Sequence, residues 1–118
     1  MSTDQITIFH NPRCSKSRQT LALLEEAGVA PRVVHYLDEP PSADELDALA
    51  TCLGLEPDQF IRKKETVYRE LAPPADTRSR QELLEAMAAQ PVLIERPIIV
   101  KGQVAVLGRP PENVRQLL

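Results

Sequence analysis

Hydrophobic residues alternate along the first short segment of the chain and then recur at helical spacing. Residues 5–10 (QITIFH) place two isoleucines on one face and Thr and Phe on the other, and an Asn-Pro pair ends the segment. This pattern predicts a strand. Apolar residues at helical spacing then predict a helix over 15–27 that ends at Gly28. A β-branched run at 32–37 predicts a second strand, so this part of the chain forms a β-α-β unit with parallel strands.

The middle of the chain, residues 42–90, is predicted to be helical. Two segments, 42–45 (SADE) and 79–82 (SRQE), have the serine and glutamate of a capping box, and each is followed by leucines at helical spacing. The first of these helices is expected to end at Gly54. A shorter helix is expected around residues 57–64.

The last part of the chain returns to β-branched sequence. Two short runs within residues 96–109 flank Gly102-Gln103, which predicts a tight hairpin. A short helix is expected over 112–118.

The order of these elements predicts an α/β fold. β-α-β, helices and then β-β-α is a thioredoxin-like arrangement, in which parallel and antiparallel strands share one mixed β-sheet and a helical insertion interrupts it. We expect one domain over residues 1–118. Its thioredoxin-like core comprises 5–38 and 91–118, and its helical insertion comprises 42–90.

Composition and charge narrow the functional classes. The chain has 118 residues, of which 42% are hydrophobic and 26% charged, and this suits one globular domain. A net charge of −3 argues against a general nucleic-acid-binding role, and no apolar run approaches the roughly 20 residues of a membrane span. The polar start does not have the pattern of a signal peptide, and the two cysteines lack the spacing of a zinc site or disulfide scaffold. We therefore expect a cytoplasmic monomer with no metal, no tightly bound cofactor, and no nucleic-acid or membrane partner.

Cys14 lies where the first strand gives way to the first helix, and its surroundings favour the thiolate. Free amides and the dipole at a helix start attract negative charge, and Arg13, Lys16 and Arg18 add positive charge nearby. The hydroxyl of Ser17 is placed to reach the sulfur across one turn. A buried, inert cysteine is the common alternative, but a cysteine that follows Asn-Pro at such a turn is poorly placed for that role. The sequence therefore predicts a reactive Cys14.

A helix start surrounded by basic residues is also a site for an oxyanion. Arg62, Arg96 and Arg109 are candidates to complete it, because the planar guanidinium group suits tetrahedral oxyanions. Taken singly, each arginine is more often a solvated surface charge. Arg96 precedes Pro97, at the start of a predicted strand, where thioredoxin-like folds have a cis-proline beside the active site.

Several segments resemble, in order, those of a known family: HNPxCxxSR at 10–18, YLxxPP at 36–41, RK at 62–63, ERPI at 95–98 and GRP at 108–110. Together they resemble the glutaredoxin-linked arsenate reductase family (ArsC), within a wider group that includes the Spx regulators. The resemblance covers nearly the whole chain.

The resemblance implies a thioredoxin-like fold and a set of site residues: the nucleophile Cys14, the anion-handling Arg62, Arg96 and Arg109, and also His10 and Ser17. It further implies that the thiolate attacks arsenate, that glutathione attacks the thiol-bound arsenic, and that glutaredoxin supplies the second reduction before arsenite leaves. Glutathione is then a co-substrate.

The residues themselves agree with an external reductant. Ser17 stands where a thioredoxin-type motif has its second cysteine, so no neighbouring thiol resolves an adduct on Cys14. Cys52, between leucines of a predicted helix, is most simply a small core residue. We expect His10 to tune charge or hold the loop, and we assign His35 no role.

Two further functions stay open. The best-known family members carry Cys-Gly-Thr-Ser-Arg where this chain has Cys-Ser-Lys-Ser-Arg at 14–18. This difference leaves three substrates open: arsenate, a related oxyanion and a glutathione mixed disulfide. A glutathione-dependent thiol reductase without arsenate activity is one alternative. An Spx-like RNA polymerase-binding regulator is the other, although Spx proteins typically use a Cys-x-x-Cys switch that this chain lacks.

Overall fold

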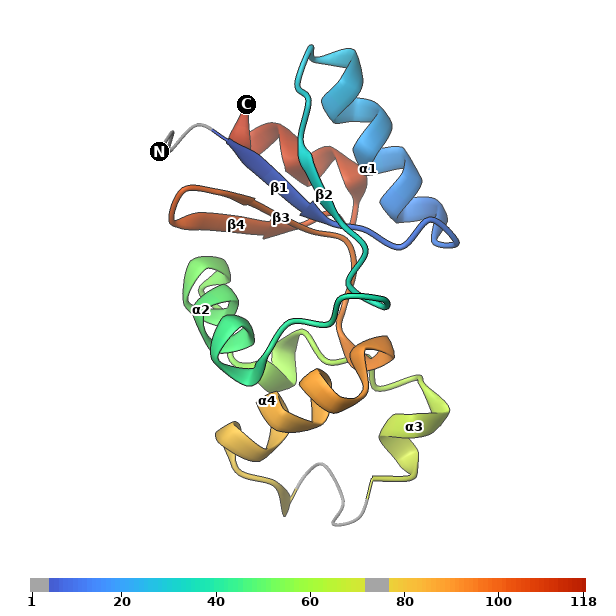
Figure 1. Cartoon of the computed structure of the whole chain (residues 1–118), viewed down its shortest axis with the longest axis vertical. Helices are drawn as coiled ribbons and strands as arrows, with labels where there is room; N and C mark the ends of the chain where they lie inside the picture. Colours follow the sequence, from blue (N-terminus) through green and yellow to red (C-terminus); the bar gives the residue numbers. More distant parts are fainter. Residues whose placement is uncertain (1–4, 72–76) are drawn as a thin grey trace. The chain divides into compact units, whose positions relative to one another are not determined.

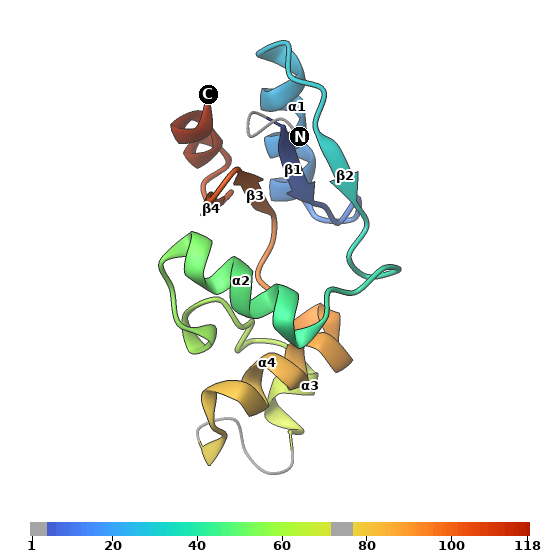
Figure 2. The same cartoon turned by 60° about the vertical axis from the view of Figure 1, so that its left-hand side comes forward.

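The computed structural model describes residues 5–71 and 77–118. The chain divides into two compact units (Figures 1 and 2). The first comprises Met1–Glu39 and Arg96–Leu118, and the second comprises Pro40–Glu95. Within the described ranges, no helix has both the length and the apolar character needed to cross a membrane.

The first unit is built on a four-stranded mixed sheet. The central strand β1 (Ile6–Phe9) pairs in parallel with β2 (Arg32–Val34) and antiparallel with β3 (Ile98–Lys101), and β3 continues into the antiparallel strand β4 (Val104–Leu107). The strand order is therefore β2-β1-β3-β4. This arrangement confirms the predicted α/β class with one mixed sheet.

Two helical segments pack together and bury an apolar face of this sheet. They are α1 (Ser15–Glu26) and the 3₁₀ helix η4 (Pro111–Leu117), which confirms the short helix expected over 112–118. The core between them and the sheet consists of Ile6, Ile8, Leu24, Ile99, Val114 and Leu117. Each buried aliphatic side chain of this kind contributes about 1.5–3 kcal/mol.

The second strand is shorter than the sequence predicts. Residues 32–37 were expected to be extended, but only Arg32–Val34 pair with β1. The carbonyl oxygen of His35 accepts hydrogen bonds from the N–H groups of Asp38 at 3.0 Å and Glu39 at 2.9 Å. The prediction of the full length was wrong because a turn takes these backbone groups.

The end of β4 packs closely against the start of β3. A Cβ atom on Gly108 would lie 2.6 Å from Cγ of Pro97 and 2.7 Å from Oγ1 of Thr20, so only glycine fits there. The N–H of Gly108 also donates to the Pro97 carbonyl at 2.9 Å. The Arg96–Pro97 peptide bond is cis, as expected, and Arg109–Pro110 is cis as well.

The predicted hairpin is also confirmed. Strands β3 and β4 are joined by Gly102-Gln103, and Gly102 adopts a φ of 63°, a left-handed conformation that glycine accepts without steric cost.

The second unit is helical. Both capping boxes are confirmed, at the starts of α2 (Ala43–Leu53) and α4 (Arg80–Ala89), and α2 ends at Gly54 in the left-handed conformation. The two helices pack against each other, and a 3₁₀ turn, η3 (Pro91–Leu93), follows α4. The core of this unit includes Leu46, Leu49, Phe60, Ile61, Leu84, Met87, Leu93 and Ile94.

The prediction of a helix around residues 57–64 is wrong beyond the first turn. Only η1 (Pro57–Gln59) forms, because the backbone then becomes extended and Ile61 pairs with Ile94 in an isolated antiparallel bridge. A short helix that the sequence did not predict, α3 (Thr66–Arg69), follows.

Candidate active site

Cys14 occupies the N-cap position of α1, as the sequence predicts. Its backbone is extended, with φ −96° and ψ 122°, and its N–H donates to the carbonyl of Asn11 at 3.0 Å. Its own carbonyl accepts the N–H of Arg18 at 3.0 Å, the first turn of the helix. The side chain is 9% exposed. The sulfur therefore sits at the end of α1 where the backbone N–H groups lack helical partners.

The first turn of α1 and one distant arginine favour the thiolate of Cys14. Burial alone raises the pKa of this thiol, but the N–H groups of Ser17 and Lys16 and the charge and hydrogen bond of the Arg96 side chain outweigh it, so the pKa is lowered overall. A lowered pKa increases the fraction of reactive thiolate at neutral pH. Within one unit, the fold thus joins Cys14 to an arginine 82 positions later in the sequence.

The hydroxyl of Ser17 does not serve the sulfur. It lies 2.6 Å from Nδ1 of His10 and accepts the N–H of Asn11 at 3.0 Å, and Ser17 is fully buried. The expected hydroxyl–sulfur bond is therefore corrected: the backbone N–H of Ser17 bonds the sulfur of Cys14, and the hydroxyl ties the end of β1 to α1.

His10 is a buried member of this cluster. Burial, the charge of His35 and the charge of Arg18 lower its pKa, in that order, so the neutral ring predominates at neutral pH. The two imidazole rings meet edge to face, with centroids 5.9 Å apart and planes at 61°.

Sequence reasoning assigned His35 no role, although a signal was present. His10 and His35 follow directly after the parallel strands β1 and β2, and the N–H of His10 donates to the carbonyl of Val34 at 2.8 Å. The carboxyl ends of paired parallel strands meet at one edge, so the residues that follow them become neighbours.

The loop before Cys14 is held by two contacts that the sequence did not predict. The side-chain oxygen of Asn11 accepts the N–H of Arg13 at 3.0 Å, and the guanidinium group of Arg18 donates to the carbonyl of Pro12 at 2.8 Å. Arg18 therefore braces the loop, and its charge also acts on His10.

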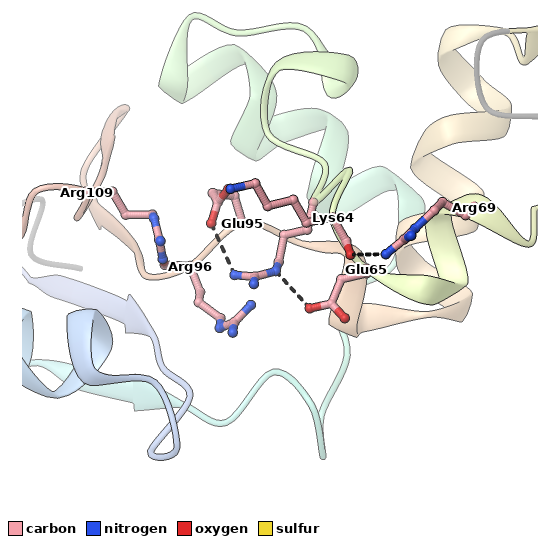
Figure 3. A network of polar contacts seen from close by, with 7 residues as sticks. Lys64, Glu65, Arg69, Glu95, Arg96 and Arg109 are labelled. Carbon is pink, nitrogen blue, oxygen red and sulfur yellow. Dashed lines mark hydrogen bonds and ion pairs between the residues drawn. The ribbon is translucent and has the colours of Figure 1, made fainter.

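Arg96 and Arg109 belong to the same unit as Cys14. The guanidinium group of Arg109 donates to the backbone carbonyl of Arg96 at 3.2 Å, and both arginines are labelled in Figure 3. The structure thus brings Cys14 and Arg96 together, and Arg109 is linked to them through the Arg96 backbone.

Arg62 belongs to the second unit, where it is held by carboxylates. Its Nε lies 3.0 Å from Oε1 of Glu65 and its guanidinium group lies 3.4 Å from Oε1 of Glu95 (Figure 3). The role of Arg62 in handling an anion at Cys14 stays a prediction. Cys52, half-buried on α2, also lies in this unit, and its assignment as a core residue stays a prediction too.

Comparison with known proteins gives a consistent picture. The model of the ArsC family matches residues 9–117. Over 115 residues the chain is 46% identical to an arsenate reductase of Neisseria meningitidis serogroup A, covering 97% of this chain and 98% of the relative. It is also 46% identical, over 117 residues and 98% of each chain, to the uncharacterized protein YfgD of Escherichia coli.

A solved structure shows the same fold. The arsenate reductase from Vibrio cholerae superposes with a TM-score of 0.93 at 50% identity, covering 97% of this chain and 98% of that one.

Proposed function

The chain belongs to the ArsC family. We propose that it is an arsenate reductase in which Cys14 is the only nucleophile that this chain supplies. Glutathione and glutaredoxin serve as the external reductants. The relatives named arsenate reductase support the reaction.

The observation that carries this proposal is the environment of the Cys14 sulfur. Two backbone N–H groups and the Arg96 guanidinium group all act on it at the start of α1. The same groups that stabilise a thiolate also stabilise a tetrahedral oxyanion brought against that thiolate. A nucleophile and an anion-binding site therefore coincide.

In the first step, the Cys14 thiolate attacks the arsenic of arsenate. A sulfur–arsenic bond forms, an arsenic–oxygen bond breaks, and the displaced oxygen leaves as water or hydroxide. Arsenic keeps its oxidation state in this step. Arg96 and Arg109 offset the charge of the incoming anion.

In the second step, the thiol of glutathione attacks the thiol-bound arsenic, so a second sulfur–arsenic bond forms and a further oxygen leaves as water. A glutaredoxin thiolate then attacks the glutathione sulfur. The bond between that sulfur and arsenic breaks, its two electrons reduce the arsenic, and a mixed disulfide forms between glutaredoxin and glutathione. Water finally displaces the Cys14 sulfur from the reduced arsenic, which releases arsenite and the Cys14 thiol. An external thiol is needed because Ser17 replaces a second cysteine in the loop.

His10 and Ser17 act in this proposal by positioning. The 2.6 Å contact between Nδ1 of His10 and the Ser17 hydroxyl fixes the first turn of α1, whose N–H groups serve the sulfur. Arg62 keeps the anion-handling role that the family resemblance predicts.

The test is a coupled assay with arsenate, glutathione, glutaredoxin, glutathione reductase and NADPH. We expect arsenate-dependent NADPH oxidation that is lost in Cys14→Ser and retained in the matched variant Cys52→Ser. No activity in the parent protein with a free Cys14 thiol would refute the arsenate proposal. Activity on a glutathione mixed disulfide alone would instead support the thiol reductase alternative.

A further inference from the structure

A cavity of about 340 Å³ in the first unit is not used as a binding site in the mechanism above. It lies between the loop that follows β1 and the turn that follows β2, and its lining includes His10, Asn11, Arg13, His35, Leu37 and Asp38. Its volume is within the range of about 300–1,000 Å³ that is usual for small-molecule sites. It is therefore large enough to hold a small ligand.

The cavity presents one cation, one anion and one amide. Arg13 and Asp38 are exposed and come from its two opposite chain segments, and no ion pair to either is present within residues 5–71 and 77–118. Asn11 is 8% exposed, and its side-chain oxygen already accepts the N–H of Arg13. Its NH₂ group therefore remains as the donor that can serve a ligand.

The cavity is lined in part by the turn that carries the nucleophile. Arg13 directly precedes Cys14, and the carbonyl of Asn11 accepts the N–H of Cys14 at 3.0 Å. A ligand in the cavity therefore contacts the same loop that positions the sulfur.

The opposite charges of Arg13 and Asp38 select the chemical class of the ligand. A free oxyanion such as arsenate is attracted by Arg13 but repelled by Asp38, whereas a molecule with an ammonium and a carboxylate group satisfies both. Electrostatics thus favour a zwitterion over the substrate anion in this cavity.

We propose that this cavity binds the reducing thiol as a small zwitterionic peptide. Asp38 binds its ammonium group, Arg13 binds a carboxylate, and the NH₂ group of Asn11 donates to a peptide carbonyl. The assignment of the bound thiol as the reductant of the Cys14 adduct rests on the proposed function. The binding itself does not, and it is measured separately.

The binding test uses S-methylglutathione, which cannot react, titrated into the full chain and followed by ¹⁵N NMR. We expect saturable shifts in the backbone amides of residues 10, 11 and 13 and of residues 35–38. Asp38→Asn and Arg13→Gln should each weaken binding about fivefold, as expected for one partly exposed ion pair. The matched variants Glu39→Gln and Arg32→Gln change an exposed charge in the same unit outside the cavity, and their affinity should equal that of the parent.

The kinetic test compares two reductants, and arsenite formation is measured directly because glutathione reductase recycles only glutathione. Asp38→Asn should raise KM for glutathione about fivefold and leave KM for arsenate unchanged. The rate with 2-mercaptoethanol, which carries neither charge, should be the same in the variant and the parent. An equal loss with both thiols would overturn the proposal.

The two proposals fail in different ways. Shifts confined to other parts of the chain, no saturable shift, or unchanged affinity in both cavity variants would overturn the thiol site. If S-methylglutathione binds as described but arsenate is not reduced, the thiol site stands and the arsenate proposal falls.

Discussion

The two units use their charged side chains differently. In the first unit, the charge of Arg96 acts on the sulfur of Cys14. In the second unit, arginines pair with carboxylates: Arg62 with Glu65 and Glu95, and Arg80 with Asp47 and Glu56. Ion pairs at a surface contribute about 0–1 kcal/mol each, whereas a charge held against a buried thiol changes its chemistry. Charge in the first unit therefore serves reactivity, and in the second it mainly serves the local structure.

The largest effect is expected when Arg96, whose charge acts on the sulfur of Cys14, is replaced. Arg96→Ala should lower turnover about 100-fold or more, the usual result of removing one group that stabilises a reacting oxyanion. It should also raise the pKa of Cys14, because the thiolate loses the charge and hydrogen bond of Arg96. The rate of alkylation by iodoacetamide, measured against pH, should then rise at higher pH than in the parent.

A structural role for Arg96 makes a different prediction. If Arg96→Ala unfolds at much lower denaturant concentration while the pH profile of alkylation stays unchanged, the charge of Arg96 does not act on the thiol and the comparison fails.

Gly108→Ala should reduce both stability and turnover. The added Cβ would meet the Pro97 ring at 2.6 Å, next to Arg96, and the backbone must move to admit it. Overpacking of this kind costs about 1–3 kcal/mol, which denaturant unfolding can measure.

Gly28→Ala is the control for this substitution. Gly28 has a positive φ of 79°, which Gly108 does not have, and its Cβ position has no atom within 4 Å. Gly28→Ala should lose stability through backbone strain and keep its turnover. Equal turnover in the two variants would show that Gly108 does not position the arginine.

Ser17→Ala should have an intermediate effect. It removes the contact with His10 and leaves the buried N–H of Asn11 without its acceptor, at a cost of about 1–3 kcal/mol. Because the backbone N–H of Ser17 serves the sulfur, we expect the pH profile of alkylation to move little. A large upward movement would show that the hydroxyl stabilises the thiolate directly.

The smallest effect is expected in the second unit. Arg80 is exposed and pairs with Asp47 at 2.7 Å and with Glu56 at 3.1 Å. Arg80→Gln should therefore lower the free energy of unfolding by at most about 1 kcal/mol, and turnover should not change. Slower turnover at unchanged stability would show that Arg80 also supports the reaction.

The parts of the fold that could be predicted are those with local causes. The capping boxes at Ser42 and Ser79, the helix end at Gly54 and the hairpin at Gly102 depend on neighbouring residues, and all were predicted. The segment at 57–64 could not be predicted in the same way, because its course depends on a bridge to a residue more than 30 positions away.

The features of the candidate site also divide into those with local causes and those that depend on residues elsewhere in the fold. The position of Cys14 follows from the Asn-Pro turn and the helix after it, and the sequence predicts it. The edge contact of His35 with His10 depends on which strands pair. The partner of the Ser17 hydroxyl depends on how the loop between β1 and α1 folds back, which the residue pattern did not reveal. The role of Arg96 was predicted from the family resemblance and the Arg-Pro pair, not from spacing.

The place of β1 in the sheet has a consequence for the growing polypeptide. Its parallel partner β2 follows within 30 residues, but its antiparallel partner β3 begins at Ile98, after the whole second unit has been synthesised. The turn with Cys14 leaves the ribosome long before Arg96 does, and contacts between residues far apart in sequence form late. The nascent chain therefore carries a thiol that lacks the charge of Arg96, and the cysteine gains its full reactivity only when residues 96–118 have folded against it.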